Sequence, residues 1–306
     1  MSKPKILVTT QMMIHDQSRF LKWLGDDGFD VEFVMNEQFL DEKSCLNLAP
    51  IYDGWIAGDD QITSNVIDHL TPCLKIISKW GSGIDSIDVE YALKNEVIIK
   101  NSPGAFKNAV SEIAVGYLLL LSRGLLDTHK QVIDGYWPKK QYIELVDANI
   151  GIIGLGAIGS SVAEKLVSFG SNIYYYDPCV NIKKFVKKDF NEILKISDFL
   201  IFACGLNNST KYMLNKKNIA HIKKGAYVIN VGRGPVIEEE ALIKGFEQKK
   251  ILGAALDVYE KEPLDKNSKL KNFNTIFGSH NANNTYQAVE KVHKLTIENL
   301  NNFFNL

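Results

Sequence analysis

Apolar residues in the first hundred positions gather in short runs rich in Val, Ile and Leu, separated by longer stretches in which apolar residues recur at helical spacing. Short apolar runs bounded by turn residues are typical of buried strands, and a period of 3.6 residues is typical of amphipathic helices. The predicted strands are 5–9, 31–33, 54–57, 75–78 and 97–99, and the predicted helices between them are 16–24, 64–70 and 88–94. This alternation predicts βαβ units and a parallel sheet.

The pattern changes after about residue 100. Ser102-Pro103-Gly104 is suited to a turn or a joint between domains, and a long apolar helix is predicted directly after it, over 107–123. A second α/β series is predicted from Asn149 to about Phe277, and a last amphipathic helix over 285–306. We expect this last helix to return to the first domain. The pattern therefore predicts an α/β fold with two doubly wound parallel-sheet domains, the first of them discontinuous in sequence.

A glycine motif opens the second series. The predicted strand 149–153 leads directly into Gly154-Leu155-Gly156-Ala157-Ile158-Gly159 and then into a helical run that ends at Phe169. In a Rossmann domain the first glycine allows a tight turn, the second lets the backbone approach a pyrophosphate, and the third lets helix and strand pack closely. The amide groups at the start of the helix, at Ala157 and Ile158, are expected to bind phosphate oxygens. The motif predicts a dinucleotide site.

The next predicted strand, 172–176, ends in Asp177, 18 residues after Gly159. An acidic side chain at this place binds the ribose hydroxyls of adenosine, and its charge repels a 2′-phosphate, so we expect NAD rather than NADP. Lys183 and Lys184 follow shortly after, and a nearby cation is what a 2′-phosphate would require. A solvated pair of lysines is the commoner reason for such a sequence.

Composition limits the classes of partner. The 306 residues carry 35 basic and 36 acidic side chains, a formal net charge of -1, which gives no overall attraction to nucleic acid or an anionic membrane. The longest apolar run, 113–121, is interrupted by Gly116, and the first residues lack a secretory pattern. The four cysteines show no CxxC spacing, so no metal site is predicted. We expect a cytoplasmic protein with a small-molecule partner.

Two later motifs read KGAYVINVGRGP at 224–235 and GAALDVYEKEPL at 253–264, and His280 follows the predicted strand at 275–277. With these motifs the chain resembles the D-isomer-specific 2-hydroxyacid dehydrogenases, the family of 3-phosphoglycerate dehydrogenase, D-lactate dehydrogenase and glycerate dehydrogenase. The resemblance extends from the turn WGSGID at 80–85 to His280. It implies a substrate-binding domain of residues 1–100 and 281–306, flavodoxin-like, and an inserted NAD-binding Rossmann domain of residues 101–280.

The resemblance also implies roles for particular side chains. Arg233 falls on the family's substrate-binding arginine, Glu262 on its catalytic glutamate and His280 on its general acid/base. This set suits the chemistry, since an arginine fork binds a carboxylate beside a carbonyl and a histidine titrates near neutrality. Glu260 is the competing carboxylate, but the family's glutamate directly precedes the proline. Asp257 resembles the family's aspartate that faces the nicotinamide amide.

The turn Gly81-Ser82-Gly83 follows a predicted strand, so its amide groups at Ser82 and Gly83 are expected to bind the substrate carboxylate; the alternative is a turn that serves only to reverse the chain. The family usually forms homodimers through its cofactor domains. The segment 125–146, with Tyr136, Trp137 and Tyr142, carries aromatic residues suited to such a contact or to filling a joint between domains.

The chain departs from the family in three places. The segment after His280 is rich in asparagine rather than glycine, the segment 202–210 lacks the usual histidine and proline, and the chain ends at Leu306, before any C-terminal regulatory domain.

The resemblance predicts an NAD-dependent enzyme acting on a small D-2-hydroxy or 2-keto acid, with 3-phosphoglycerate the first candidate. A hydroxypyruvate or glyoxylate reductase is the alternative within the class. An NAD(H)-sensing regulator without turnover is the alternative from another class, and a formate dehydrogenase fits less well because it needs no proton transfer to a carbonyl.

Overall fold

The short apolar runs of the first hundred residues form five parallel strands in the computed structural model, which describes residues 3–306. The strand order is β2-β1-β3-β4-β5, the flavodoxin-like order, with a switch point between β1 and β3. The strands are β1 (Lys5–Val8), β2 (Asp30–Phe33), β3 (Gly54–Ala57), β4 (Ile76–Lys79) and β5 (Ile98–Lys100). Together with the helices around them they form unit 1, which runs to Phe106 and resumes at Asn284.

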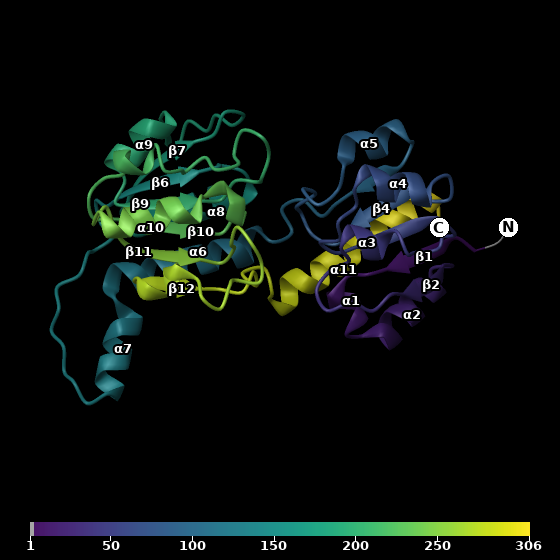
Figure 1. The fold of residues 1–306 in the computed structure, drawn as a ribbon, viewed down its shortest axis with the longest axis horizontal. Helices are drawn as coiled ribbons and strands as arrows, with labels where there is room; N and C mark the ends of the chain where they lie inside the picture. The colour runs from purple at the N-terminus through teal and green to yellow at the C-terminus, as the bar shows by residue number, and fades with distance from the viewer. Residues whose placement is uncertain (1–2) are drawn as a thin grey trace. The chain divides into compact units, whose positions relative to one another are not determined.

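Helices cover both faces of this sheet, which is why β3 and β4 are buried along their whole length. The helices of unit 1 are α1 (Gln11–Ile14), α2 (Gln17–Asp26), α3 (Glu42–Cys45), α4 (Ser64–Leu70), α5 (Val89–Lys94) and α11 (Tyr286–Phe304). The predicted C-terminal helix forms as α11 and packs against β4 (Figure 1). There the Ser78 hydroxyl donates a hydrogen bond to the Thr296 carbonyl at 2.8 Å, so the two ends of the chain share one core.

Unit 2, Lys107–Asn283, contains a seven-stranded parallel sheet in the order β12-β11-β10-β9-β6-β7-β8. This is the Rossmann order with one added strand, and its switch point lies between β6 and β9. The strands are β6 (Asn149–Ile153), β7 (Asn172–Tyr176), β8 (Val186–Lys187), β9 (Phe199–Phe202), β10 (Ala226–Asn230), β11 (Ile251–Leu256) and β12 (Thr275–Phe277). The fold is therefore the predicted pair of doubly wound α/β domains.

The central strands β9 and β10 are fully buried, because helices lie on both faces of this sheet as well (Figure 1). The helices of unit 2 are α6 (Lys107–Arg123), α7 (Leu125–Ile133), α8 (Ala157–Val167), α9 (Phe190–Ile196) and α10 (Glu239–Glu247), with short 3-10 turns at Ile219–His221, Gly234–Val236 and Lys269–Asn272. Helices α6 and α8 pack against each other around a polar contact, where the Lys165 ammonium donates to the hydroxyls of Ser111 and Ser161 at 2.9 Å each.

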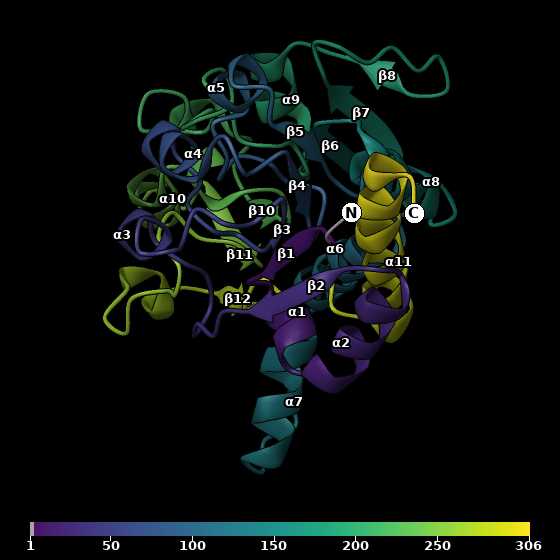
Figure 2. The same cartoon turned by 90° about the vertical axis from the view of Figure 1, so that its right-hand side faces the viewer.

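Helix α7 differs from the others, since none of its residues is buried. It extends away from the sheet of unit 2 and is followed by a long loop (Figures 1 and 2). Within the described part of the chain, no single helix is long and apolar enough to cross a membrane; only α6 and α7 taken together pass that test, as a pair bent by 60°.

Candidate active site

Three of the site residues predicted from the sequence each follow one of three neighbouring strands in unit 2. Arg233 follows β10, Asp257 follows β11, and His280 follows β12. These strands are parallel and hydrogen-bonded in the order β10-β11-β12, so the three residues lie along one carboxyl edge of the sheet. Open α/β sheets place their ligands at that edge.

His280 and Glu262 are in direct contact. The Nδ1 atom of His280 lies 2.7 Å from Glu262 Oε2, and Glu262 Oε1 accepts a hydrogen bond from the Tyr259 amide at 3.0 Å. An ionised carboxylate can only accept, so Nδ1 carries the proton of this bond, and Nε2 is the ring nitrogen that can exchange a proton with a ligand. The geometry suits a general acid/base whose far nitrogen is oriented by a carboxylate.

Asp257 holds the backbone that carries His280. His280 has a left-handed backbone with a φ of 55°, and its amide donates to the Asp257 carbonyl at 2.8 Å. The Asp257 carboxylate accepts from the Ala282 amide at 3.1 Å, and the Tyr117 hydroxyl of α6 lies 3.4 Å from its other oxygen. Burial raises the pKa of Asp257, while these bonds and nearby His280 lower it. Asp257 therefore fixes the segment on both sides of the histidine.

Arg233 lies in a turn that needs glycine after it. A Cβ atom at Gly234 would collide with the backbone carbonyl of Tyr259, so only glycine lets the two segments approach this closely. The Asn230 side chain donates to the Arg233 carbonyl at 3.0 Å and accepts from the Gly232 amide at 3.1 Å. The arginine is thereby positioned by β10 and by the chain that leads to Glu262.

The glycine motif forms the predicted strand-turn-helix. Gly154 has a φ of +88°, and a Cβ atom at Gly159 would collide with the Gly154 carbonyl oxygen, so both positions require glycine. A Cβ atom at Gly156 would meet nothing within 4 Å. No side chain caps the N-terminus of α8, whose first residues are Ala157 and Ile158. Uncapped amide groups beside an open glycine backbone fit the pyrophosphate of a dinucleotide.

Asp177 lies at the end of β7, as predicted, and its carboxylate contacts the glycine turn. One oxygen accepts from the Leu155 amide at 2.8 Å, and the other accepts from the amides of Cys179 and Val180 at 2.9 and 3.0 Å. The sequence placed Asp177 beside a ribose but did not reveal that it also braces the glycine turn. Its negative charge is thus held in place by three backbone donors.

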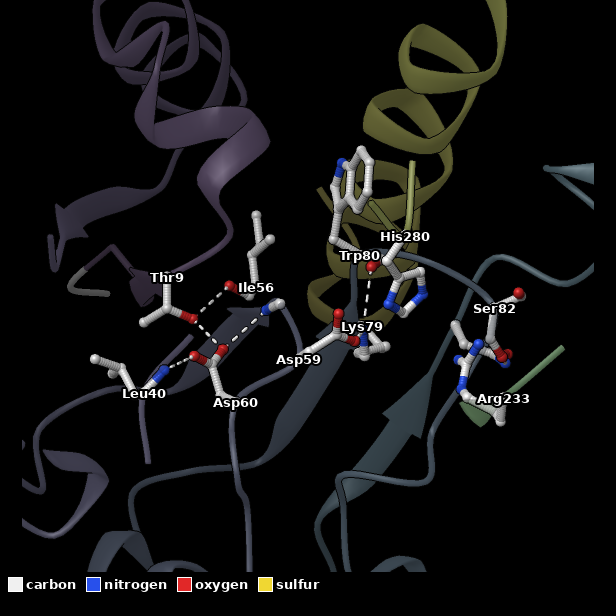
Figure 3. Close-up of polar contacts among 12 residues, drawn as sticks. Thr9, Leu40, Ile56, Asp59, Asp60, Lys79, Trp80, Ser82, Arg233 and His280 are labelled. Atoms are coloured by element: carbon white, nitrogen blue, oxygen red, sulfur yellow. Dashed lines mark hydrogen bonds and ion pairs between the residues drawn. The ribbon is translucent and has the colours of Figure 1, made fainter. Parts of the chain in front are cut away.

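The carboxyl edge of the unit 1 sheet is organised around a buried aspartate at its switch point (Figure 3). Asp60 is fully buried and accepts from the Thr9 hydroxyl at 2.5 Å and from the Leu40 and Gly58 amides at 2.8 Å each. Burial raises its pKa, and these bonds together with the nearby Lys79 oppose that effect. The carboxylate ties together the segments that follow β1 and β3.

The turn that holds Ser82 and Gly83 follows β4 on the same edge. Ser82 is exposed, and the Asn101 side chain donates to its carbonyl at 2.7 Å. Just before this turn, the nearly buried Lys79 contacts the exposed Asp59 at 2.9 Å and donates to the Trp80 carbonyl at 3.3 Å (Figure 3). Sequence reasoning did not consider Lys79, although its position at a strand end beside a glycine turn was a usable signal.

Tyr117 was also missed, because α6 approaches the strand ends only through tertiary packing. Among residues 3–306 no group of three or more His, Cys, Asp or Glu side chains is arranged to hold a metal ion. The chemistry of the described groups is that of carboxylate binding, proton transfer and dinucleotide binding.

The chain is similar to a protein family and to several known proteins. The family model for the D-isomer specific 2-hydroxyacid dehydrogenase, NAD binding domain, matches residues 115–282. A glyoxylate reductase of Thermofilum pendens is 35% identical over 254 residues, which cover 79% of this chain and 75% of that protein. A D-3-phosphoglycerate dehydrogenase of Methanocaldococcus jannaschii is 33% identical over 304 residues, which cover 97% of this chain but 56% of that longer protein.

The fold has a counterpart among solved structures. The crystal structure of D-lactate dehydrogenase from Aquifex aeolicus, complexed with NAD and lactic acid, matches with a TM-score of 0.89 over 98% of this chain and 95% of that chain. At 24% identity this likeness is evidence of the fold. From the family match and the two relatives, the chain belongs to the D-isomer-specific 2-hydroxyacid dehydrogenases, a family of NAD-dependent oxidoreductases, and residues 115–282 are its NAD-binding domain.

Proposed function

We propose that this chain interconverts a small 2-keto acid and the corresponding D-2-hydroxy acid, with Arg233, Glu262 and His280 as its catalytic residues. The observation that carries the proposal is the 2.7 Å contact between His280 and Glu262 on the same sheet edge as Arg233. A family member that only sensed the cofactor would have no need of an oriented proton donor.

Each of these three residues has a separate role in the proposed reaction. Arg233 binds the planar carboxylate of the keto acid through its guanidinium fork and polarises the neighbouring carbonyl. NADH, when bound at the glycine turn, would supply the hydride. His280 gives the proton on Nε2 to the carbonyl oxygen, and Glu262 stabilises the charged imidazole that precedes this transfer. In the direction of oxidation, the neutral Nε2 takes the hydroxyl proton instead.

Four further residues bind substrate or cofactor in this proposal. Ser82 and Gly83 of unit 1 offer backbone amides to the carboxylate, because they form a turn at the carboxyl edge of a parallel sheet. Asp177 selects NAD over NADP, since its fixed charge repels a 2′-phosphate. Asp257, whose carboxylate accepts from the Ala282 amide beside His280, is assigned to face the nicotinamide amide.

The relatives support two kinds of substrate. Glyoxylate reductases of Thermofilum pendens and Thermococcus onnurineus are 35% and 30% identical to this chain, which favours glyoxylate or hydroxypyruvate. The D-3-phosphoglycerate dehydrogenase of Methanocaldococcus jannaschii, at 33% identity, favours 3-phosphohydroxypyruvate. A phosphorylated substrate requires a second cation beside Arg233, and a small keto acid does not.

The first experiment mixes the purified protein with NADH and, one at a time, glyoxylate, hydroxypyruvate, 3-phosphohydroxypyruvate and pyruvate, and follows the absorbance of the reduced cofactor. Oxidation of NADH with one acid establishes turnover and identifies the substrate class. If NADH binds but no acid in the panel is reduced, the proposed function fails, and a regulator that senses NAD(H) becomes the better hypothesis.

A further inference from the structure

Glu260 lies two residues before Glu262, and its side chain does not contact His280 in any described bond. It points instead to the start of α10. Glu260 Oε2 accepts a hydrogen bond from the Glu239 amide at 2.6 Å, and Glu239 Oε1 accepts one from the Glu260 amide at 3.0 Å. Each glutamate therefore binds the backbone of the other, and we call this pair the reciprocal clasp.

The clasp joins the two segments that carry the proposed catalytic residues. Glu239 ends the segment that begins at Arg233, and Glu260 belongs to the turn that ends at Glu262. The same two segments also touch where Gly234 packs on the Tyr259 backbone. Outside the sheet ladder, the clasp and this packing contact hold the two segments together.

A third segment is attached to the clasp. The Tyr212 amide donates to the Pro235 carbonyl at 2.8 Å, and the Tyr212 hydroxyl faces Glu260, which raises the pKa of that tyrosine. On the Arg233 side, the Glu238 side chain accepts from the Lys216 amide at 2.9 Å. The loop that follows β9 is thereby held to Glu260 and to the segment that begins at Arg233.

Two carboxylates at such close range repel each other, and burial adds to the cost. Burial and the charges of Glu260 and Glu240 raise the pKa of Glu239, whereas its bond from the Glu260 amide lowers that pKa. Bonds from backbone amides to ionised acceptors are among the stronger hydrogen bonds in proteins. Two half-buried carboxylates that repel each other lower the stability of the fold. Their presence at this place therefore indicates a role for the Glu239–Glu260 contact other than stabilising the fold.

We propose that Glu239 and Glu260 are positioning residues that set the distance between the substrate-binding Arg233 and the proton-transfer pair Glu262–His280. This inference rests on the roles proposed above for Arg233, Glu262 and His280. The Tyr259 amide, which donates to Glu262, belongs to the residue directly before Glu260. A shift of the turn at Glu260 therefore moves the Glu262 carboxylate away from the imidazole.

The test compares four variants in the same assay. Glu260→Ala removes the acceptor, Glu260→Asp keeps the charge but shortens its reach, and Glu260→Gln keeps an oxygen that can accept the Glu239 amide. Glu240→Ala is the matched control, since Glu240 is an exposed neighbour on α10 outside the clasp.

We expect Glu260→Ala to raise the KM for the keto acid and to lower kcat, each by about tenfold, with the KM for NADH unchanged. Glu260→Asp should change the same two constants in the same direction but less. In Glu260→Gln both constants should stay within about threefold of the wild-type values, and in Glu240→Ala they should equal the wild-type values.

A second measurement does not depend on turnover. Hydrogen exchange of segments 231–240 and 258–263 should be faster in Glu260→Ala and close to the wild type in Glu260→Gln. Kinetics and exchange in Glu260→Ala and Glu260→Asp equal to the wild type would overturn the proposal, as would a Glu260→Gln variant as impaired as Glu260→Ala. If the wild type reduces no keto acid, the proposed function fails, and the exchange data alone decide whether the clasp holds the two segments.

Discussion

His280 is held at two points: the Glu262 carboxylate binds its imidazole at Nδ1, and the Asp257 carbonyl accepts from its backbone amide. The proposed role of the His280 imidazole is proton transfer to the substrate, so its removal should lower turnover but leave the affinity for the cofactor unchanged. We expect His280→Ala to lower turnover by about 10²- to 10⁴-fold while the dissociation constant for NADH is unchanged. His221→Ala, an exposed histidine of the same unit, is the control. Unchanged turnover in His280→Ala would show that another group transfers the proton.

Asp177 offers a test of cofactor choice at a single side chain. Asn in its place keeps an oxygen for the Leu155 amide but loses the charge that opposes a 2′-phosphate. We expect Asp177→Asn to lower the preference for NADH over NADPH by about tenfold, or about 1.4 kcal/mol, in the ratio of the two kcat/KM values. A ratio that stays at the wild-type value would mean that shape rather than charge selects the cofactor.

Helix α7 and the loop after it carry apolar side chains that nothing in the described chain covers. Ile133 is 70% exposed and Trp137 is 79% exposed. Exposed apolar surface of this kind marks an association site, and we propose that a second copy of the chain binds there to give a homodimer. The expected result is a dimer by light scattering for the wild type and a monomer for the double variant Ile133→Ser with Trp137→Ser. Leu93→Ser, an exposed leucine of unit 1, should leave the mass unchanged. A wild-type monomer would contradict the proposal.

Elements with a strong local signal could be predicted from the sequence. The strands at 54–57 and 149–153 and the helix at 107–123 form where their apolar runs indicated. The four-residue helices α1 and α3 span little more than one turn, and β8 has two residues, so no periodic pattern is visible in them. The predicted strand at 75–78 forms one residue later, at Ile76–Lys79, which is within the usual uncertainty of strand ends.

Some features of the candidate site could also be predicted from the sequence, and others could not. Glycines and strand ends are local features, so the dinucleotide turn and the positions of Asp257 and His280 could be read from the order of residues. The contacts of Tyr117 with Asp257, and of Glu239 with Glu260, join residues far apart in sequence on different elements. Such pairs depend on strand order and on helix packing, which a single sequence does not specify.

At the scale of the whole molecule, the stability of unit 1 should depend on pH through one buried histidine. The Trp80 indole donates to His293 Nδ1 at 3.1 Å, and burial, with a smaller contribution from Arg19, lowers the pKa of His293 from 6.5 to about 4. Because the unfolded chain binds this proton more readily, the stabilisation is complete above about pH 6.5 and is lost as the pH falls toward about 4.

We therefore expect His293 to remove about 2 kcal/mol from the unfolding free energy of unit 1 between pH 7.5 and pH 5. Urea unfolding followed by the fluorescence of Trp23, Trp55 and Trp80, which all lie in unit 1, would measure it. His293→Gln lacks the titrating group, so its unfolding free energy should fall by that much less than that of the wild type. Equal pH dependence in the two proteins would contradict the assignment.

The packing of α11 against β4 has a consequence for the order of events on the ribosome. Unit 2 is encoded by one uninterrupted segment, whereas unit 1 needs Ile297 and Leu300, which are both buried and follow unit 2 in the sequence. The first hundred residues therefore emerge with the surface of β4 that α11 covers still exposed, and it stays exposed throughout the synthesis of unit 2. During translation the cofactor-binding half can be finished first, and the half made earliest is completed last, with exposed apolar strands that a chaperone would recognise.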